Sequence, residues 1–398
     1  MLLPLEEAQA RLLAHARATG EERLALADAA GRVLADRRIV AAVDVPPFAN
    51  SSMDGFALRA ADAPGVLRVT GEIAAGAGSV QSVEGGTAVR IMTGAPLPPG
   101  ADSVVPIEDV AESDGVVSVP SPVTPGAFVR LAAHDTRAGD VVVLAGPLSP
   151  ARLAVLASLG IGEVKVLRRP VVAILSTGDE LVDPGVPLRP GQIHDANGPS
   201  LAAAVIEAGG EPRILDRVGD DPAAIERTLG AAASSADLIV TSGGVSVGRH
   251  DHVRTVLERR GTLDFWRIAV QPGKPLAVGE LDGTTIIGLP GNPVSALVTF
   301  ELFARPFIRA MLGLTGDGRL RVRATATERM AKDRGRRAFL RVVLNRTDDG
   351  YVARPAGGQQ SSQLRPLADA NALHVIPENV DAAEPGVGYE AIVLEPPA

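Results

Sequence analysis

Residues 170 to 314 alternate between short apolar runs and amphipathic stretches, and this alternation constrains the fold more than any other feature of the sequence. The strand-like runs are Val171–Leu175, Arg213–Val218, Asp237–Thr241, Leu276–Val278 and Thr284–Ile287. The helix-like stretches between and after them are Ser200–Ala208, Pro222–Ala233, Val253–Arg260 and Pro293–Met311. Strands that alternate with helices form a parallel sheet covered on both faces. The alternation predicts a doubly wound α/β domain, which binds ligands in the loops that follow its strands.

The remaining sequence predicts helices and small β modules. Apolar residues recur at helical spacing over residues 4–19, and a second helix is expected at Leu24–Ala35. Between residues 45 and 146, short β-branched runs separated by Gly and Pro predict an all-β module. A helix at Pro150–Leu159 follows, so the β module is expected as an insertion into a domain formed by both flanks. A final β domain is predicted from the short strands Arg319–Ala326, Ala338–Leu344 and Ala391–Leu394.

Length and composition exclude several classes of protein. A chain of 398 residues predicts two to four domains. Its net charge of -8 opposes binding to nucleic acid or to anionic membranes, so neither is expected as a partner. No apolar run approaches the ~18 residues of a membrane span, and the N-terminus lacks the features of a signal peptide, which predicts a cytoplasmic protein. The absence of cysteine excludes disulfides, thiolate metal sites and Cys nucleophiles.

Two predicted strands run directly into loops of small and polar residues. These loops are Ser176–Leu181 and Ser242–Gly248. Backbone N–H groups and hydroxyls at the carboxyl end of a strand can hold an anion such as phosphate. A tight turn explains either loop alone, but two such loops in one sheet favour an anion pocket. Neither loop has the spacing of a Walker loop or of a dinucleotide-binding fingerprint.

A third loop, Gly288–Ala296, leaves a strand and opens a helix. Asn292 is a favourable N-cap, and Pro293 loses no useful N–H in the first turn, so structural punctuation explains most of this loop. Its Pro-Gly-Asn-Pro core also suits a rigid pocket wall. The preceding turn carries Arg267 and Lys274, which could neutralise an oxyanion; a solvated turn is the alternative.

Several carboxylates occupy predicted turns: Asp54, Asp135, Glu180, Asp220 and Asp251. An ordinary turn or cap role is the alternative for each. Mg²⁺ takes a few carboxylates together with substrate phosphates, so a subset would form a metal site if folding gathers them. A zinc site at His250-Asp251-His252 is disfavoured, because residues two apart on a helix point to different faces. The sequence lacks a Gly-x-Ser-x-Gly elbow, which argues against a Ser-His-Asp hydrolase.

Six motifs taken together resemble the molybdopterin molybdenumtransferase family, which includes bacterial MoeA and the E domain of gephyrin. They span nearly the whole chain in the family's order: Asn-Ser-Ser-Met-Asp-Gly-Phe-Ala (50–57), Ile-Met-Thr-Gly-Ala-Pro (91–96), Ser-Thr-Gly-Asp-Glu-Leu (176–181), Ser-Gly-Gly-Val-Ser-Val-Gly (242–248), Pro-Gly-Lys-Pro (272–275) and Gly-Leu-Pro-Gly-Asn-Pro-Val-Ser-Ala (288–296).

The resemblance implies a homodimer of multidomain α/β and β subunits. Its expected domains are a split mixed domain (1–44 plus 147–169), an inserted β domain (45–146), a molybdopterin-binding-like α/β domain (170–316) and a C-terminal β barrel (317–398). It also implies the last step of molybdenum cofactor synthesis, in which adenylylated molybdopterin and molybdate give the cofactor and AMP with Mg²⁺. Contacts with the upstream adenylyltransferase and with acceptor molybdoenzymes are further expectations.

Roles carried over from the family fall on individual residues. Catalytic roles are expected for Asp54, Thr93, Asp135, Glu180, Asp220 and Asp251. Metal binding is expected for Asp54, Glu180, Asp220 and Asp251. The anion loops, the cations and the family's cleft residues are expected to bind the pterin cofactor precursor and molybdate: Ser176, Thr177, Gly178, Ser242, Gly243, Gly244, Ser246, Arg267, Lys274, Pro290, Pro293, Arg341 and Ser361.

Three positions depart from the family pattern. Asp135 lies in Ala133-His134-Asp135, where many relatives have Gly-Glu-Asp, while Arg267 and Gln271 stand where several relatives carry lysine. Gln271 loses a charge, which bears on anion binding but not on the reaction class. A non-catalytic scaffold of the same fold is the alternative function, but retention of the polar residues favours catalysis. An adenylyltransferase shares the α/β domain and lacks the extra β domains. Molybdate and tungstate are not distinguished by the sequence.

Overall fold

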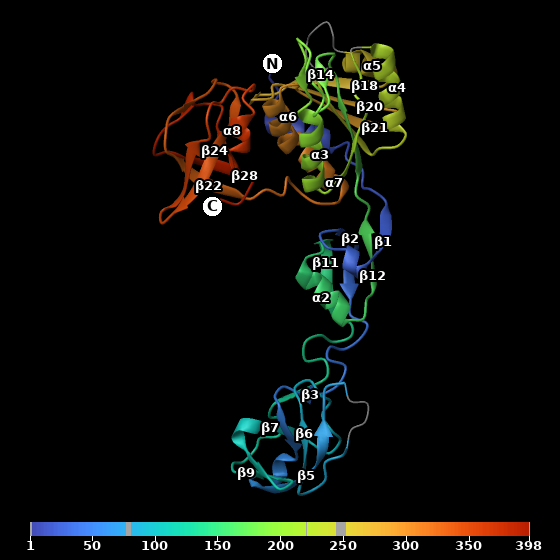
Figure 1. Cartoon of the computed structure of the whole chain (residues 1–398), viewed down its shortest axis with the longest axis vertical. Helices are drawn as coiled ribbons and strands as arrows, with labels where there is room; N and C mark the ends of the chain where they lie inside the picture. Colours follow the sequence, from blue (N-terminus) through green and yellow to red (C-terminus); the bar gives the residue numbers. More distant parts are fainter. Residues whose placement is uncertain (1, 77–80, 220, 244–251, 398) are drawn as a thin grey trace. The chain divides into compact units, whose positions relative to one another are not determined.

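The computed structural model describes residues 2–76, 81–219, 221–243 and 252–397, apart from the side chains of His252 and Phe265. The chain divides into two compact units (Figure 1). Unit 1 consists of Met1–Glu21 together with Leu167–Ala398, and unit 2 of Glu22–Val166. Unit 1 is therefore built from two segments that unit 2 separates in the sequence.

The first sheet of unit 1 confirms the predicted α/β architecture. Its strands follow the order β16 (Glu211–Ile214), β13 (Val171–Ser176), β17 (Leu238–Ser242), β21 (Thr284–Leu289), β20 (Pro275–Leu281) and β18 (Thr262–Arg267). The strands from β16 to β21 are parallel neighbours, whereas β20 runs antiparallel to both β21 and β18. The carboxyl ends of β13, β17 and β21 therefore meet at one edge of the sheet.

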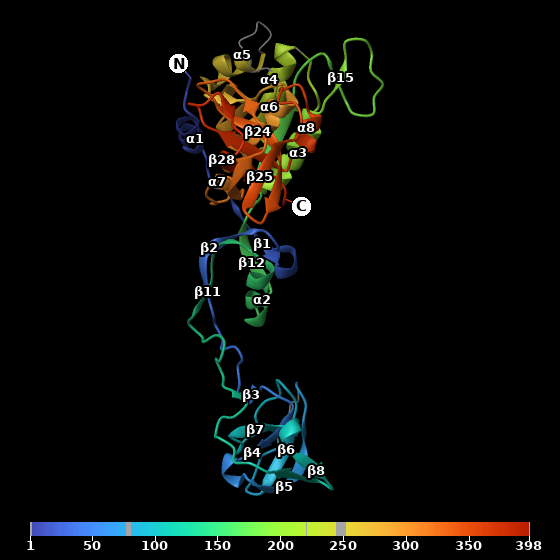
Figure 2. The same ribbon diagram turned by 90° about the vertical axis from the view of Figure 1, so that its left-hand side faces the viewer.

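Helices cover both faces of this sheet. Val172 and Ile174 of β13 pack into one core with α1 (Leu5–Leu13), α3 (Asn197–Ala208), α6 (Pro293–Thr299) and α7 (Arg305–Met311). Ala173 and Leu175 pack into the opposite core with α4 (Pro222–Ala233) and α5 (His252–Arg260). This alternation is the period of two that a strand buried on both faces requires. The views in Figures 1 and 2 show the two helical layers.

The C-terminal strands form a closed barrel. Hydrogen bonds link β24 (Arg337–Thr347), β25 (Gly350–Pro355), β22 (Arg321–Ala326), β28 (Gly388–Val393) and β26 (Ala372–Ile376), and β26 pairs back onto β24. Closure removes the unpaired edges that an open sheet would expose. The short strand β19 (Val270–Gln271) leaves the α/β domain and pairs in parallel with β24. The barrel is thus joined to the α/β domain by backbone hydrogen bonds.

Unit 2 contains two main sheets. The first has the order β1 (Glu21–Ala25), β12 (Glu163–Leu167), β2 (Val33–Val40) and β11 (Val141–Pro147), with α2 (Pro150–Ser158) following β11. The second has the order β7 (Ser103–Pro106), β4 (Gly55–Leu58), β6 (Thr87–Ile91), β5 (Gly65–Ile73), β9 (Val116–Val119) and β8 (Ala111–Ser113). The short strands β3 (Asn50–Ser51) and β10 (Val129–Arg130) pair beside it.

Three predicted helices differ from the structure. The first ends at Leu13 instead of residue 19. The helix expected at Leu24–Ala35 is wrong, because this segment forms β1, a short 3-10 turn and β2. Leu24 and Leu26, two residues apart, pack against the same core, and Gly31 has a φ of 70°, which ends a helix. The helix expected at Pro293–Met311 is interrupted by a π-helical segment, Phe300–Ala304.

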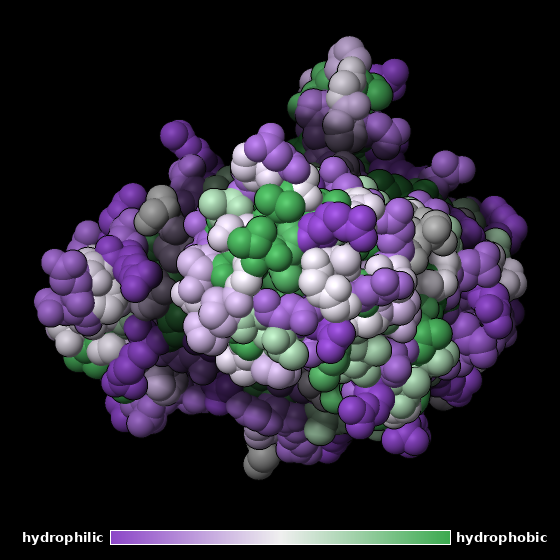
Figure 3. Space-filling model, turned by 90° about the horizontal axis from the view of Figure 1, so that it is seen from below, coloured by the Kyte–Doolittle hydropathy of each residue, from purple (hydrophilic) through white to green (hydrophobic). Residues whose placement is uncertain are grey.

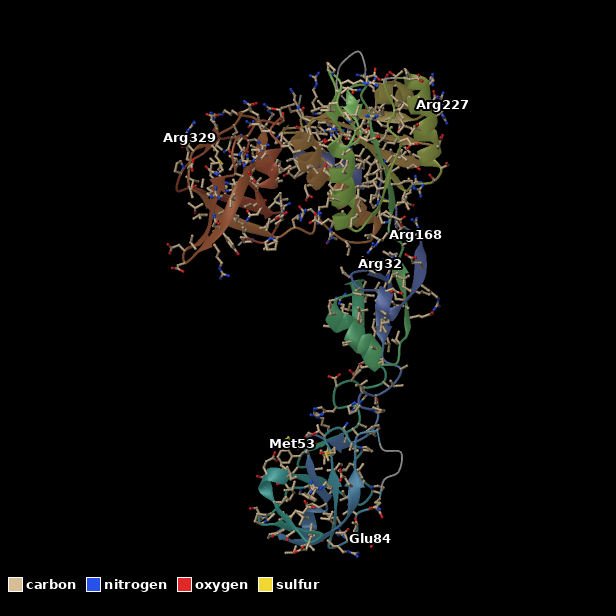
Figure 4. The ribbon with its side chains drawn as sticks, in the orientation of Figure 1. Arg32, Met53, Glu84, Arg168, Arg227 and Arg329 are labelled. Carbon is tan, nitrogen blue, oxygen red and sulfur yellow. The ribbon has the colours of Figure 1, made fainter. Side chains whose placement is uncertain are left out.

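The two segments of unit 1 meet beside the start of the sheet. The Thr19 hydroxyl donates to the carbonyl of Arg168 (2.6 Å), and the Arg168 N–H donates to the carbonyl of Gly20 (2.7 Å). Arg168 also forms two hydrogen bonds with Asp237 (2.7 and 2.8 Å; Figure 4). Burial raises the pKa of Asp237, but hydrogen bonds from Arg168 and from the Val171 N–H bring it below its ordinary value. This carboxylate remains ionised at neutral pH and fixes the start of β13.

Two observations concern the apolar residues of the described chain: the character of its helices, and the distribution of apolar residues on the face seen from below. None of the described helices combines the length and apolar character that a membrane crossing would need. In the space-filling view, apolar residues lie in small groups among hydrophilic ones (Figure 3). Such scattered apolar residues are ordinary for a protein surface.

Candidate active site

A cavity of about 590 Å³ lies at the carboxyl edge of the α/β sheet. The three loops expected to bind ligands all contribute to it. Residues predicted for binding or catalysis that line the cavity are Thr177, Gly178, Glu180, Ser242, Gly243, Pro290 and Pro293. Cavities of this size accommodate small organic ligands. The structure therefore places these seven residues together around one space.

Asn197 holds two of these loops in place. Its side-chain Nδ2 donates to Ser242 Oγ (2.6 Å) and to the carbonyl of Gly291 (2.7 Å). Ser242 lies at the end of β17, and Gly291 precedes α6. The Thr177 N–H also donates to the Ser242 carbonyl (3.2 Å). The cavity wall is therefore cross-linked by hydrogen bonds among the ends of β13, β17 and β21.

Asp195 lies two residues before α3, the helix that follows this edge. Its Oδ1 accepts hydrogen bonds from the N–H groups of Asn197 (2.9 Å) and Gly198 (3.0 Å). These groups are among the first donors of α3, which have no partner within the helix. The side chain is only 8% exposed, although Asp195 lines the cavity. A nearly buried carboxylate thus faces the same space as the predicted loops.

A long loop adjoins the cavity. It connects β14 (Leu181–Val182) to β15 (Ile193–His194) and extends from the body of the unit (Figure 2). The carbonyl of Val186, within this loop, is 2.8 Å from His194 Nε2, and His194 lines the cavity together with Ile193. The base of the loop therefore forms part of the cavity wall.

The predicted cations lie beside the cavity instead of within its described lining. Arg267 and Lys274 are both exposed, and Pro275, which follows Lys274, lines the cavity. Gln271 turns toward the barrel, where its Oε1 accepts a hydrogen bond from the Asp333 N–H (3.0 Å). This glutamine, which stands where the family resemblance predicts lysine, therefore has a structural contact of its own.

The barrel residue Ser361 reaches the third loop. Asn292 Nδ2 donates to Ser361 Oγ (3.2 Å). Asn292 occupies the N-cap position of α6 as predicted. Its side chain does not accept a hydrogen bond from the first turn of the helix but contacts the barrel. Ser361 thus lies next to a residue that lines the cavity, and its expected binding role stays a prediction.

Arg341 differs from the expectation that it lines a cleft. Its side chain is fully buried, at 0% exposure, and it donates to the carbonyls of Gly358 (2.7 Å) and Gln360 (3.2 Å). Burial lowers the pKa of the guanidinium. The side chains of Ala338, Leu340, Val342 and Leu344 on β24 point into the barrel core, so Arg341 points to the opposite face of the strand. There the loop at residues 358–360 covers its side chain, and Arg341 supports this loop, which carries Ser361.

Three predicted catalytic residues lie in unit 2. Asp54 Oδ1 accepts hydrogen bonds from the Thr93 N–H (2.6 Å) and the Thr93 hydroxyl (2.8 Å). The backbone hydrogen bond from Thr93, with that of its hydroxyl, holds the pKa of Asp54 below its ordinary value. The turn lies directly after Met53, which is labelled in Figure 4. Asp135 is exposed in the loop before β11 and receives a hydrogen bond from the Thr136 hydroxyl (3.3 Å).

Four predicted residues lie outside the described part of the chain: Asp220, Gly244, Ser246 and Asp251. Of the expected metal ligands, Glu180 belongs to unit 1 and Asp54 to unit 2. The described residues contain no group of three or more His, Asp or Glu side chains that could hold a metal. Glu180 alone among the described metal candidates lines the cavity.

Asp195 and Asn197 were not predicted as site residues. The helix was expected to begin at Ser200, but it begins at Asn197. An Asp followed by a helix containing an early proline is a signal for a helix start. This signal could have placed Asp195 at the carboxyl edge, yet its exposure to the cavity depends on the fold.

Comparisons with known proteins match the whole chain. Three family profiles match in order: the MoeA N-terminal region (domains I and II) at residues 3–160, a probable molybdopterin binding domain at 173–310, and the MoeA C-terminal region (domain IV) at 323–394. A protein of Haemophilus influenzae named molybdopterin molybdenumtransferase is 38% identical over 402 residues, covering 99% of this chain and 98% of the relative. Molybdopterin molybdenumtransferase 2 of Mycobacterium tuberculosis is 41% identical over 356 residues, covering 86% and 87%.

Solved structures agree with this likeness. Two molybdopterin biosynthesis MoeA proteins from Pyrococcus horikoshii superpose with TM-scores of 0.85 and 0.83. Their sequences are 33% and 29% identical to this chain, and the matches cover 100% and 99% of it and 100% of each structure. The similarity therefore extends over the described fold as well as over the sequence.

Proposed function

Because the chain belongs to the molybdopterin molybdenumtransferase family, enzymes of molybdenum cofactor biosynthesis, we propose that it inserts molybdenum into adenylylated molybdopterin. In this reaction molybdate and the adenylylated pterin are consumed, and the molybdenum cofactor and AMP are released with the help of Mg²⁺. The observation that carries the proposal is the cavity at the carboxyl edge of the α/β sheet, where three Gly- and Pro-containing loops converge.

The chemistry of the cavity suits a ligand of this kind. Thr177 and Ser295 contribute hydroxyls to the cavity wall, whereas the Ser242 hydroxyl is engaged by Asn197 and Pro290. Hydroxyls and backbone N–H groups at the ends of strands bind oxyanions. Hydrogen bonds from Asn197 hold the loops of Ser242 and Gly291 in position before a ligand arrives. A fixed arrangement of this type reduces the entropy lost on binding.

Mg²⁺ is proposed as the metal, with Glu180 as a ligand in unit 1. Mg²⁺ is commonly held by one or two carboxylates together with substrate phosphates and water. Glu180 and Asp195 both line the cavity, and Glu180 is the one of the two that the family resemblance assigns to the metal. One carboxylate beside the substrate phosphates fits that mode of binding. When bound, Mg²⁺ would neutralise the charge on the pyrophosphate link and so favour departure of AMP.

We also propose a homodimer, and contacts with the upstream adenylyltransferase and with the molybdoenzymes that receive the cofactor. These proposals rest on the resemblance of the chain to its family. Light scattering of the purified protein measures the mass directly. A monomer with full activity would exclude a functional dimer.

The experiment for the proposed reaction is incubation of the purified protein with adenylylated molybdopterin, followed by measurement of AMP. Release of AMP should require both molybdate and Mg²⁺, and Glu180→Gln should reduce it. An unchanged rate in EDTA would exclude the metal role, and AMP release without molybdate would exclude coupling to metal insertion. Replacing molybdate with tungstate in the same assay measures the selectivity between the two oxyanions.

A further inference from the structure

Asp195 presents one carboxylate oxygen that the protein itself does not use. Oδ1 accepts the hydrogen bonds from Asn197 and Gly198 at the start of α3. Among the described residues, no donor forms a hydrogen bond with Oδ2. The side chain lines the cavity and is only 8% exposed. An anionic oxygen that faces a cavity without a protein partner can accept a hydrogen bond from a donor on a ligand.

The surroundings of this oxygen leave room for such a donor. A Cβ atom at Gly198 would lie 2.7 Å from Asp195 Oδ2 and 3.7 Å from Ser176 Oγ. Any other residue at position 198 would therefore crowd the carboxylate. Ser176 Oγ and Asn197 Oδ1 are also buried without a hydrogen-bond partner in the described structure. Unused polar atoms, most of them acceptors, are thus concentrated around the start of α3.

The ligand group that fits is a neutral donor on a flat ring. No lysine or arginine occurs among the described residues that line the cavity, so Asp195 has no cation from these residues to balance it. The pyrimidine ring of a pterin carries a 2-amino group next to N3–H, and both groups donate hydrogen bonds. An adenine ring carries a single amino group flanked by acceptor nitrogens. A carboxylate with free lone pairs therefore suits the pterin edge better.

We propose that Asp195 Oδ2 accepts a hydrogen bond from the 2-amino group of the pterin and so selects the pterin ring of the substrate. This inference rests on the proposed function, because it assigns the pterin end of the adenylylated substrate to the start of α3. In this proposal Asp195 binds the pterin ring and takes no part in the reaction. The loops of the same cavity bind the phosphate groups.

The test is a pair of ligands that differ at this one position. 6-Hydroxymethylpterin has the 2-amino group, whereas 6-hydroxymethyllumazine has a carbonyl oxygen there. Each is titrated against the full chain, and binding is followed by the fluorescence of the ligand. The unaltered protein should bind the pterin at least about tenfold more tightly, the scale of one hydrogen bond to a charged group.

Asp195→Asn should remove or reverse this preference. The asparagine oxygen can still accept the N–H groups of Asn197 and Gly198, so α3 keeps its cap, while an NH₂ group replaces Oδ2. That group repels the pterin amino group and can donate to the lumazine carbonyl. Asp183→Asn is the matched control, since it removes the same charge from an exposed position and should leave the pterin-to-lumazine ratio unchanged. Circular dichroism checks that both variants fold.

Several results would overturn the assignment. They are equal binding of the two compounds by the unaltered protein, binding of neither, or an unchanged ratio in Asp195→Asn. Asp195→Asn could also change the affinity for AMP while the ratio of pterin to lumazine affinity stays the same. That result would place the adenine at Asp195 and would reject the proposal as well. Failure of the molybdenum insertion assay with an intact pterin preference would refute the proposed reaction while leaving this site in place.

Discussion

Gln271 Oε1 accepts a hydrogen bond from the Asp333 N–H at 3.0 Å, which joins the turn beside the cavity to the C-terminal barrel. Backbone pairing of β19 with β24 continues the same junction through Val270 and Arg337. The family resemblance predicts lysine at position 271, so in this chain a hydrogen-bond acceptor takes the place of the expected cation. The exchange affects both the charge near the cavity and the attachment of the barrel.

Gln271→Lys should therefore have two opposite effects. The new cation should lower the half-saturating molybdate concentration modestly, because an exposed charge is screened by solvent and salt. The ammonium cannot accept a hydrogen bond from Asp333, so stability should fall by about 0.5–1.5 kcal/mol. Titration of molybdate and thermal unfolding measure the two effects. Gln271→Glu is the control, since it keeps the acceptor, and a Lys variant as stable as the unaltered protein would contradict the junction role.

Lys274→Gln and Arg267→Gln should weaken binding of an anionic ligand. If each cation contributes a charge-assisted hydrogen bond, its loss costs roughly 1.5–3 kcal/mol, and the half-saturating ligand concentration rises at least several-fold. Both side chains are exposed, so their removal should change stability by no more than about 0.5 kcal/mol. Molybdate and adenylylated pterin are titrated separately. Unchanged half-saturation for both ligands in both variants would remove this turn from the active site.

Asp54→Asn should abolish AMP release without unfolding unit 2. The asparagine oxygen can still accept from the Thr93 N–H, so the turn should be retained and the melting temperature nearly unchanged. Because hydrogen bonds from Thr93 lower the pKa of Asp54, its stabilising contribution is present above the ordinary carboxyl pKa. That contribution is lost only as the pH falls through the lower folded value. The activity profile of the unaltered protein between pH 5 and 9 should therefore show no step from Asp54, and full AMP release by Asp54→Asn would contradict the catalytic assignment.

Arg319→Gln should destabilise unit 1 by about 3 kcal/mol, since it leaves a buried carboxylate poorly compensated. Arg319 binds Glu301 (2.9 Å) and Glu207 (2.6 Å), and its side chain is only 9% exposed. Burial alone would lower the pKa of Arg319, but these two carboxylates raise it. Arg321→Gln is the control, because Arg321 is 44% exposed and its pair should contribute at most about 1 kcal/mol. Urea unfolding of both variants measures the difference, and equal losses would contradict the argument.

Arg341→Met should reduce activity while changing stability little. The described residues supply no acidic partner for this buried guanidinium, and an apolar side chain avoids its desolvation cost. The carbonyls of Gly358 and Gln360 lose their donor, so the loop that carries Ser361 should become less ordered. Thermal unfolding within about 1 kcal/mol of the unaltered protein, with slower AMP release, is the expected result. Full activity would show that the loop needs no support from Arg341.

The sequence predicted what depends on local pattern. The alternation of residues 170–314 placed the sheet and its ligand-binding edge, because buried parallel strands and amphipathic helices have distinct periods. The segment Leu24–Ala35 failed because nine of its twelve residues are apolar, five of them alanine, and so few polar positions do not distinguish a period of two from a helical period. Composition likewise could not indicate that the arginine at position 341 is buried beneath the loop at residues 358–360.

Only part of the candidate site could be predicted, because some of its residues are brought together by topology and others by contacts between distant segments. Loops that follow strands were assigned correctly to the cavity, since topology alone brings them to one edge. Asp195 and Asn197 were missed because their contacts with Ser242 and Gly291 cross long intervals of sequence. Nor could residue spacing show that Gln271 is engaged by Asp333. Contacts between distant segments depend on the folded chain.

The hydrogen bonds that link Thr19 and Gly20 to Arg168 bring together the two points at which unit 2 enters and leaves its host. A host domain whose cut ends are already adjacent loses little chain entropy when a segment is inserted or removed there. Unit 1 can therefore tolerate changes in the length of unit 2 without rearranging its own sheet. This junction makes the interrupted α/β core a modular host, in which the inserted unit can diverge independently of the cavity.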